Sequence, residues 1–548
     1  MPRPFSTVNL SRRGLLLGTA IGAAGMLVGC GSGGGSRSSG AGNVPTGWTW
    51  PETLPFDGPV PDLPPVPDGV NAGFLGYPDI DSLVRTVTEK PGDGSPVTAM
   101  TPNYGPVPLD KNRNAYWQFI NAELGSDLDV RMVPGSEYAS VFATTVASGD
   151  VPDIFTLEVT PRQPEFLASQ AVDLTDHLAG DAIAAYPNLA GNPEAAWRYS
   201  VFNGRVYTIP IYRGLRTSWA LIQRSDFMAE NGYQQPTSFE ELLDIAVDFT
   251  NPSQNRWAFS DIPADFLRQC MGIPNQWGVD GDEITCAWAD ERQAELFEAG
   301  RRLMDAGVVH PEAFDDSGRK KRLTDGNALF AQDGLGGWNA FYATISAYYP
   351  ELADSFDIDG TRVFDFAAGH VGQPWRGPDV EVQGVIGKRA ESRVETVLAV
   401  ANWLAAPVGS IEKHYQDFGV EGEHHTMEDG VPIKTQAGID QWLNLQLMVS
   451  APFTVFDPKH PRATERLHAF QTYLAEASLR SAADGLYSET FVADGGAAEL
   501  TFQDLTNDIV QGRRSADDWQ REVDDFMLAT GDAIVDELKR ARDETANA

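Results

Sequence analysis

A polar bend between two apolar runs holds residue types suited to bind a polar ligand. The side chains of this bend can donate hydrogen bonds or present a flat aromatic face to a ligand. They belong to Tyr212, Arg213, Arg216 and Trp219. The flanking runs, residues 207–211 and 219–222, predict short strands, and Pro210 favours an edge position for the first. We interpret the bend as a crossing between two lobes, with these side chains bordering the cleft. An ordinary hairpin within one domain fits the pattern equally well.

Motifs for covalent or metal chemistry are incomplete. Residues 317–320 read Ser-Gly-Arg-Lys and fit Ser-x-x-Lys, but the Ser-Asp-Asn and Lys-Thr-Gly motifs that accompany it in β-lactamases are absent from the sequence. Residues 423–425 read Glu-His-His, without the His-Glu-x-x-His spacing of a zinc site. We therefore expect no catalytic residue, no metal and no cofactor.

The amino terminus has the pattern of an export and lipidation signal. Residues 11–17 read Ser-Arg-Arg-Gly-Leu-Leu-Leu, which resembles a twin-arginine signal, and the apolar run after them is too short for a convincing membrane span. Residues 27–30 read Leu-Val-Gly-Cys, which is similar to a bacterial lipobox. We expect residues 1–29 to be removed and lipid on Cys30 to tether the protein to the outer face of the cytoplasmic membrane. A chance cysteine behind a signal peptide is the alternative.

A tether rich in Gly, Ser and Pro is predicted at residues 30–95. Its first part is Gly/Ser-rich and flexible by composition, whereas residues 45–67 are dense in proline and favour extended coil. This proline-dense part could stand free or wrap on the folded body. The aromatic residues Trp48, Trp50 and Phe56 favour wrapping, because a free linker has no use for them.

The composition is that of a large acidic protein. With 548 residues the chain is too long for one core and allows two to four domains. The net charge of -36 repels phosphates, so nucleic acid and anionic membrane surfaces are not expected partners. Cys270 and Cys286 could form a disulfide closing a loop of about 15 residues in an oxidising compartment. Two separate buried thiols are the alternative.

The body begins with alternating strands and helices. Hydrophobic periodicity predicts, in chain order, strand, helix, strand, helix and strand at residues 97–100, 110–124, 128–132, 136–148 and 151–155. This spacing favours an α/β unit with parallel strands. Such sheets hold ligands beyond the carboxyl ends of their strands, which places Tyr104 and Asp153 near a candidate site. Further helices are predicted at residues 239–249, 290–306, 392–404 and 515–542, and a strand at residues 382–386.

Four segments follow one another in an order that matches a known family. The first two read Ala-Ser-Gly-Asp-Val-Pro-Asp-Ile at 147–154 and Asn-Gly-Arg-Val-Tyr-Thr-Ile-Pro at 203–210. The others read Gln-Arg-Ser-Asp at 223–226 with Pro-Thr-Ser-Phe-Glu-Glu at 236–241, and Phe-Gly-Val-Glu-Gly-Glu-His-His at 418–425 with Asp-Gly at 429–430. Behind a lipobox, this series resembles the lipoprotein type of extracellular solute-binding protein family 1, the substrate-binding components of ABC importers for sugars and oligosaccharides. The resemblance spans most of residues 96–435.

The resemblance implies an α/β, two-lobed fold of the type II periplasmic-binding-protein-like class, with a hinge between the lobes and the ligand in the interlobe cleft. Lobe 1 would hold residues 96–216 plus 384–450, and lobe 2 with its packing helices would hold residues 217–383 plus 451–548. Some members carry an acidic calcium-binding loop after the helix that begins at Pro-Thr. Residues 251–256 read Asn-Pro-Ser-Gln-Asn-Arg and lack a carboxylate, so we expect no calcium there.

The implied function is to capture an extracellular carbohydrate and deliver it to an ABC permease by hinge closure, as a monomer and without catalysis. A sugar receptor needs flat rings and fixed polar groups. The candidate stacking residues are Trp219, Trp257, Trp277, Trp338 and Trp375. The candidate polar contacts are Tyr104, Asp153, Tyr212, Arg213, Arg216 and Arg376. The best placed is Trp338, because a glycine-rich turn precedes it where the family delivers a stacking residue.

Alternatives stay open for these residues and for the protein class. Each tryptophan could belong to the core, and the arginines could form interlobe ion pairs. A secreted glycan-active enzyme, a hydrolase or lyase, could use a carboxylate pair hidden among the many acidic residues. A cell-surface adhesion lipoprotein is a third class.

Overall fold

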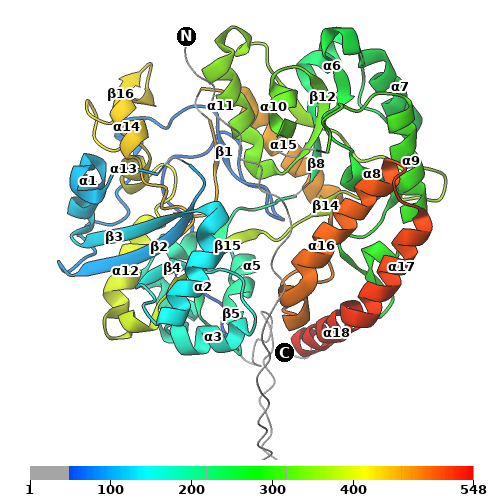
Figure 1. The fold of residues 1–548 in the computed structure, drawn as a ribbon. Coiled ribbons are helices and arrows are strands. Elements are labelled where there is room, and N and C mark those ends of the chain that lie inside the picture. Colours follow the sequence, from blue (N-terminus) through cyan, green and yellow to red (C-terminus); the bar gives the residue numbers. More distant parts are fainter. Residues whose placement is uncertain (1–47, 106, 218, 315–317, 458, 547–548) are drawn as a thin grey trace, which may run out of the picture. The chain divides into compact units, whose positions relative to one another are not determined.

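The structure is a computed structural model, and it describes residues 48–105, 107–217, 219–314, 318–457 and 459–546. The chain divides by its internal contacts into residues 1–37 and residues 38–548. The fold below belongs to the second of these units (Figure 1). The predicted twin-arginine signal and the lipidation site Cys30 lie outside the described residues.

One sheet is built mostly from the first part of the chain. Its strands, in spatial order, are β3 (Asp127–Pro134), β2 (Pro96–Asn103), β4 (Ile154–Thr156), β15 (Val380–Ile386) and β7 (Thr208–Tyr212). As predicted, β2 runs parallel to both β3 and β4. Helices α1 (Ala115–Leu124) and α2 (Tyr138–Ser148) make the two connections. The first helix starts later than predicted because Asn114 caps it, accepting a hydrogen bond from the Trp117 amide at 2.8 Å.

A second sheet has the order β13 (Ile358–Gly360), β8 (Ala220–Arg224), β12 (Ala328–Asp333) and β9 (Trp257–Phe259). Strand β12 is antiparallel to β8 and parallel to β9. Helices α7 (Phe239–Phe249), α8 (Ala264–Met271) and α9 (Gln293–Asp305) contribute apolar residues to the core beside this sheet. Ser238 caps α7, since its side chain accepts a hydrogen bond from the Glu241 amide.

The chain crosses between the two sheets at the predicted bend. Strand β7 lies at the edge of the first sheet, where Pro210 is tolerated, and β8 belongs to the second sheet. The two strands are not paired, so the hairpin alternative is wrong. The Leu215 amide donates to the Gly69 carbonyl at 2.6 Å, and Gly214 has φ 69°. A Cβ at Gly214 would lie 2.2 Å from the Asn71 side-chain oxygen, so this bend needs glycine.

The proline-dense segment packs onto the body from residue 48 onward. Trp48, Trp50 and Leu54 contact the core of the first sheet. The amides of Glu52 and Leu54 donate to carbonyls of residues 180 and 190. Strand β1 (Gly73–Phe74) pairs in parallel with β18 (Val455–Phe456). The described part of the predicted tether is therefore a wrapped segment rather than a free one.

The carboxyl-terminal helices lie beside the second sheet (Figure 1). They are α15 (Pro461–Ala477), α16 (Glu489–Val510), α17 (Ala516–Phe526) and α18 (Asp532–Ala546), and α15 supplies Leu467 and Phe470 to the core around Trp338. Helix α16 supplies Phe502 and Ile509 to the core beneath α8 and α9. A π-helical turn, Met527–Gly531, separates α17 from α18, where a single helix was predicted.

Shorter elements complete the fold. The remaining strands are β5 (Val201–Phe202), β6 (Arg205–Val206), β10 (Trp277–Asp280), β11 (Glu283–Cys286), β14 (Trp375–Arg376), β16 (His425–Glu428), β17 (Val431–Lys434) and β19 (Leu479–Arg480). The remaining α-helices are α3 (Gln163–Gln170), α4 (Thr175–Leu178), α5 (Glu194–Trp197), α6 (Ser225–Asn231), α10 (Arg319–Thr324), α11 (Trp338–Tyr348), α12 (Val394–Leu404), α13 (Ile411–Phe418) and α14 (Gln436–Gln441). Helix α12 and strand β15 confirm the predictions for residues 392–404 and 382–386.

The predicted disulfide between Cys270 and Cys286 is not formed, and both residues are free and buried. The Cys270 thiol lies in helix α8 beside the backbone N–H of Phe364. The Cys286 thiol lies at the end of β11, beside the backbone N–H groups of Trp288 and Ala289. Because the two sulfur atoms contact different backbone segments, each behaves as a small apolar side chain of the core.

Alkylation of the denatured protein without prior reduction is expected to label Cys270 and Cys286 fully, because neither sulfur is bridged. In the native protein the same reaction should be slow, because burial raises the pKa of both thiols and keeps them protonated. Peptide mapping by mass spectrometry measures both states. A pair of peptides joined at these two cysteines, and separated only by reductant, would contradict the structure.

Candidate functional site

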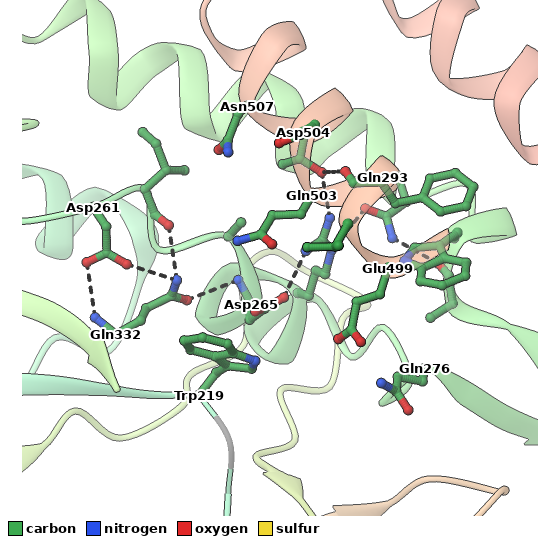
Figure 2. A pocket seen from close by; sticks show the side chains of 18 of the residues that line it. Trp219, Asp261, Asp265, Gln276, Gln293, Gln332, Glu499, Gln503, Asp504 and Asn507 are labelled. Atoms are coloured by element: carbon green, nitrogen blue, oxygen red, sulfur yellow. Dashed lines mark hydrogen bonds and ion pairs between the residues drawn. The ribbon is translucent and has the colours of Figure 1, made fainter. Parts of the chain in front are cut away.

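A cavity of about 340 Å³ opens beside the second sheet, between α8, α9 and α16. The start of β8, the end of β12 and the strand β14 complete its wall. The lining combines aromatic rings with many amide and carboxylate groups, as Figure 2 shows. Ligand sites typically have this mixture of flat apolar surface and placed polar groups. We therefore treat this cavity as the candidate site and call it the α16 pocket.

Three tryptophans line the α16 pocket. Trp219 is half-buried, and the guanidinium carbon of Arg319 lies 4.9 Å from its ring centroid. Trp375 is only 8% exposed, and its indole N–H donates to the Ile273 carbonyl at 2.9 Å. Trp288 stacks on Phe502 with the ring centroids 4.3 Å apart. Of the three, Trp219 is partly exposed and, among the described residues, no other aromatic ring stacks on it.

Gln332, at the end of β12, joins two parts of the pocket wall. Its side-chain nitrogen donates to the Asp261 carboxylate and to the Ile262 carbonyl. Its side-chain oxygen accepts from the amides of Asp265 and Phe266, at the start of α8, at 3.1 Å each. These amides would otherwise be left without intrahelical partners. Gln332 therefore fixes the position of Asp265 and of the first turn of α8.

The two arginines of the pocket are held by protein groups. Arg268 donates from each of its three guanidinium nitrogens, to Asp265, Gln293 and Thr506. Arg319 donates to the buried Asp261 carboxylate at 3.4 Å while its guanidinium covers Trp219. Each cation is thus paired with a carboxylate inside the wall, so the pair contributes little net charge to the space that a ligand would enter.

Burial raises the pKa of the Asp261 carboxyl to about 6, against the opposing effects of Arg319 and Gln332. The folded protein therefore binds this proton more tightly than the unfolded chain does, and ionisation of Asp261 destabilises the fold. We expect the stabilisation from protonated Asp261 to be lost as the pH rises from about 4 to about 6.

The variant Asp261→Asn tests the predicted direction of this pH dependence of stability. The free energy of unfolding of the wild type, minus that of the variant, should fall between pH 4 and pH 6 and become constant above about pH 7. Urea denaturation at a series of pH values measures it. A difference that stays constant over the whole range would contradict the raised pKa.

Polar side chains of α16 form the wall that lies across from Trp219 in Figure 2. They are Glu499, Gln503, Asp504 and Asn507. Glu499 lies beside Gln276, and burial together with the Asp265 charge raises the pKa of its carboxyl group. Because Phe502 and Ile509 of the same helix are buried in the core, the backbone that carries these four residues is fixed.

The predicted polar contacts lie elsewhere. Asp153 is 2% exposed, accepts hydrogen bonds from Thr98 and forms an ion pair with Arg393. It is therefore a structural carboxylate of the first sheet. Tyr104, in contrast, is 78% exposed at the carboxyl end of β2. Neither residue lines the α16 pocket. Their prediction relied on the first sheet, whereas the pocket belongs to the second.

The residues of the crossing bend contact protein groups instead of the pocket. Arg213 donates to Glu381 at 2.7 Å, and Arg216 lies 3.8 Å from the same carboxylate. Arg376, 3% exposed, donates from two of its nitrogens to Asp379. Burial raises the pKa of the Tyr212 hydroxyl to about 12. Arg213, Arg216 and Arg376 therefore form ion pairs within the protein, and the interlobe character that was the alternative for the arginines near the bend stays a prediction.

Two of the predicted stacking residues are core side chains. Trp277 and Trp338 are each 1% exposed, and Trp338 packs on Phe470 with a centroid distance of 6.1 Å. Trp257 is half-buried on β9 with its ring against His310, and it does not line the pocket. The prediction that Trp338 is the best stacking platform is therefore wrong, because helix α11 directs its first side chain inward.

Two features are absent from the described part of the chain. None of its helices is long and apolar enough to cross a membrane. Within the same residues, no group of His, Cys, Asp or Glu side chains is arranged to hold a metal ion.

Solved structures share this fold along most of the chain. An extracellular solute-binding protein from Bifidobacterium longum subsp. infantis matches with a TM-score of 0.59 and 15% identity, covering 84% of this chain and 100% of that one. The alginate-binding protein AlgQ2 without calcium matches with a TM-score of 0.58 and 14% identity, covering 83% and 99%. The chain has the type II periplasmic-binding-protein-like fold. The N-glycan transport solute-binding protein NgtS from Streptococcus pneumoniae shares this fold, with a TM-score of 0.56, 14% identity and coverage of 83% and 99%.

Sequence comparison adds a partial relative. Lipoprotein LipO of Bacillus subtilis (strain 168) is 22% identical over 244 residues, which are 42% of this chain. The chain spans about half the length of this relative, since the match covers 47% of it. No protein-family model matches the chain.

Proposed function

We propose that the protein is a lipid-anchored solute-binding protein that captures an extracellular carbohydrate and delivers it to an ABC permease. Proteins with the same type II fold bind alginate or transport N-glycans, by their names. The observation that carries the proposal is the α16 pocket, in which Trp219 faces amide and carboxylate groups. A pyranose presents a C–H face that stacks on an aromatic ring, and its hydroxyls bond to amide and carboxylate groups.

Export and anchoring are part of the proposal. The twin-arginine pattern and the lipobox ending at Cys30 support transport across the cytoplasmic membrane and lipidation there. LipO, the partial relative, is named a lipoprotein. The protein would work as a monomer on the outer face of the membrane. Detergent partitioning of the protein, lost in the variant Cys30→Ala, tests this anchor.

Ligand capture would use the crossing segments as a hinge. The two lobes would be residues 96–216 plus 384–450 and residues 217–383 plus 451–548. The separate sheets support the boundary after residue 216, since β7 and β8 belong to different sheets and follow one another along the chain, whereas strand β15 of the first sheet extends across the boundary after residue 383. The described lining of the α16 pocket belongs to the second of these lobes, so a ligand held there would have to contact the first lobe as well to shift the population toward the closed form, which the permease would recognise.

The protein would release its ligand unchanged. A thermal-shift screen against neutral, amino and acidic oligosaccharides, with chromatography of each mixture after incubation, tests both parts of the proposal. We expect at least one sugar to raise the melting temperature and no sugar to be cleaved. Cleavage products would favour the glycan-active enzyme instead, and a screen without any thermal shift would contradict carbohydrate binding.

A further inference from the structure

The charged groups of the α16 pocket are not balanced. Its two cations are paired within the wall, Arg268 with Asp265 and Arg319 with Asp261. Glu499 and Asp504, in contrast, form no ion pair in the described part of the chain. Two carboxylates therefore lack a counter-charge on the side of the pocket that α16 supplies.

The position of these two carboxylates is fixed by the helix that carries them. Phe502, between them in sequence, is 1% exposed and packs against Trp288 and Trp519. Thr506, one turn later, accepts a hydrogen bond from Arg268. The backbone that carries the two carboxylates therefore cannot move away from a ligand without breaking these contacts.

The surroundings of Glu499 make its charge effective. Its side chain is exposed to solvent, and burial of the carboxyl group together with the Asp265 charge raises its pKa, so a positive charge placed beside it is favoured. A partly shielded carboxylate interacts with a nearby charge more strongly than one in open water. The whole chain has a net charge of -36, which adds a repulsive field for anions outside the pocket.

We propose that the α16 pocket selects sugars by charge, with Glu499 and Asp504 as specificity-determining residues. It rejects uronic acids and binds sugars with a protonated amine more tightly than their neutral counterparts. This inference rests on the proposed carbohydrate-binding function. A uronate carboxylate would meet two unpaired carboxylates and no free cation of the described pocket lining, whereas an ammonium group would supply the missing counter-charge.

Matched tetrasaccharides test the inference. The probes are neutral, amine-bearing and uronate tetramers of the same linkage, in a β-1,4 and an α-1,4 series, titrated by calorimetry at low salt and pH 7, where Asp261 is ionised and neutralises Arg319. We expect the amine-bearing tetramer of the preferred linkage to bind about tenfold or more tighter than the uronate, which is about 1.4 kcal/mol. Added salt should reduce this difference in affinity between the amine-bearing and the uronate tetramer.

Charge-removing variants assign the effect to α16. The double variant Glu499→Gln with Asp504→Asn should reduce the preference for amine over uronate to less than about threefold, with neutral sugars still bound. The control is Asp494→Asn with Asp525→Asn, which removes the same charge from exposed positions that do not line the pocket. It should leave the preference as in the wild type.

Each outcome is decisive. A uronate bound as tightly as the amine-bearing tetramer, with neutral sugars also bound, would overturn charge selection and leave the carbohydrate-binding function intact. An unchanged preference in the pocket variant would overturn the assignment to Glu499 and Asp504. Binding of none of the tetramers would overturn the proposed function together with the inference.

Discussion

The variant Trp219→Ala is expected to lose most of its sugar affinity while it stays folded. Trp219 is a half-buried ring of the pocket lining, beside Arg319 and across from α16. Loss of a stacked ring should cost about 1–3 kcal/mol of binding, by analogy with bases stacked on aromatic side chains. This range corresponds to an increase in Kd of about 5- to 150-fold. Calorimetric titration with the tightest sugar of the screen measures it.

Trp257→Ala is the matched control for Trp219. Trp257 is also half-buried and also lies on the second sheet, but it contacts His310 and does not line the pocket. Its removal should leave Kd within about twofold of the wild type. Equal loss of affinity in both variants would show that general damage to the second sheet, and not stacking on Trp219, explains the result.

Trp338→Ala is expected to act on stability instead of binding. The Trp338 ring is 1% exposed and fills the core between α11 and α15, against Phe470. Truncation of a buried tryptophan should lower the free energy of unfolding by about 3–5 kcal/mol, because it removes apolar contacts and leaves a cavity. Urea denaturation measures this loss, and the folded fraction should bind sugar with the affinity of the wild type.

Tyr348→Ala controls for changes elsewhere on helix α11. Tyr348 ends the same helix and is 76% exposed, so its removal should change stability by no more than about 0.5 kcal/mol. If Trp338→Ala unfolded at the same urea concentration as the wild type but lost sugar binding, Trp338 would be a ligand residue and its place in the core would be wrong.

Local sequence patterns were sufficient to predict much of the fold. The periodicity of residues 96–156 predicts the parallel unit of β2, β3 and β4, because each strand and helix there has its own apolar face. The bend at residues 213–217 is also predictable, since Pro210 requires an edge strand. The order of the second sheet is not predictable in this way. Its strands β8, β12 and β13 come from distant segments, and their pairing depends on tertiary contacts.

The candidate site was harder to predict than the fold. Among the predicted residues, Trp219 and Trp375 line the pocket and the others do not. Trp338 follows a glycine-rich turn, but the sequence does not show that this turn starts a helix with its first residue in the core. The predicted site also omitted the amides and carboxylates of α16. Polar residues on an amphipathic helix are usually solvated. Those of α16 form part of the pocket wall only because this helix packs beside α8 and α9.

Gln332 is a further residue that sequence alone could not identify. It lies in the apolar strand β12, and its function depends on Asp261 and on the first turn of α8 being close in space. A buried polar side chain within a strand is a weak signal, because its partners are unknown until the sheet is assembled. Asp261 and Asp265 share this property, since their roles come from the arginines that contact them.

A crystal structure of the protein with the tightest sugar of the screen is the most direct test of the central claim, that the α16 pocket is a carbohydrate-binding site. The account predicts an intact sugar in this pocket, with one pyranose face on Trp219 and hydroxyl or amine groups bonded to Glu499 and Gln503. A sugar bound elsewhere with the pocket empty, or a cleaved sugar within it, would contradict the account.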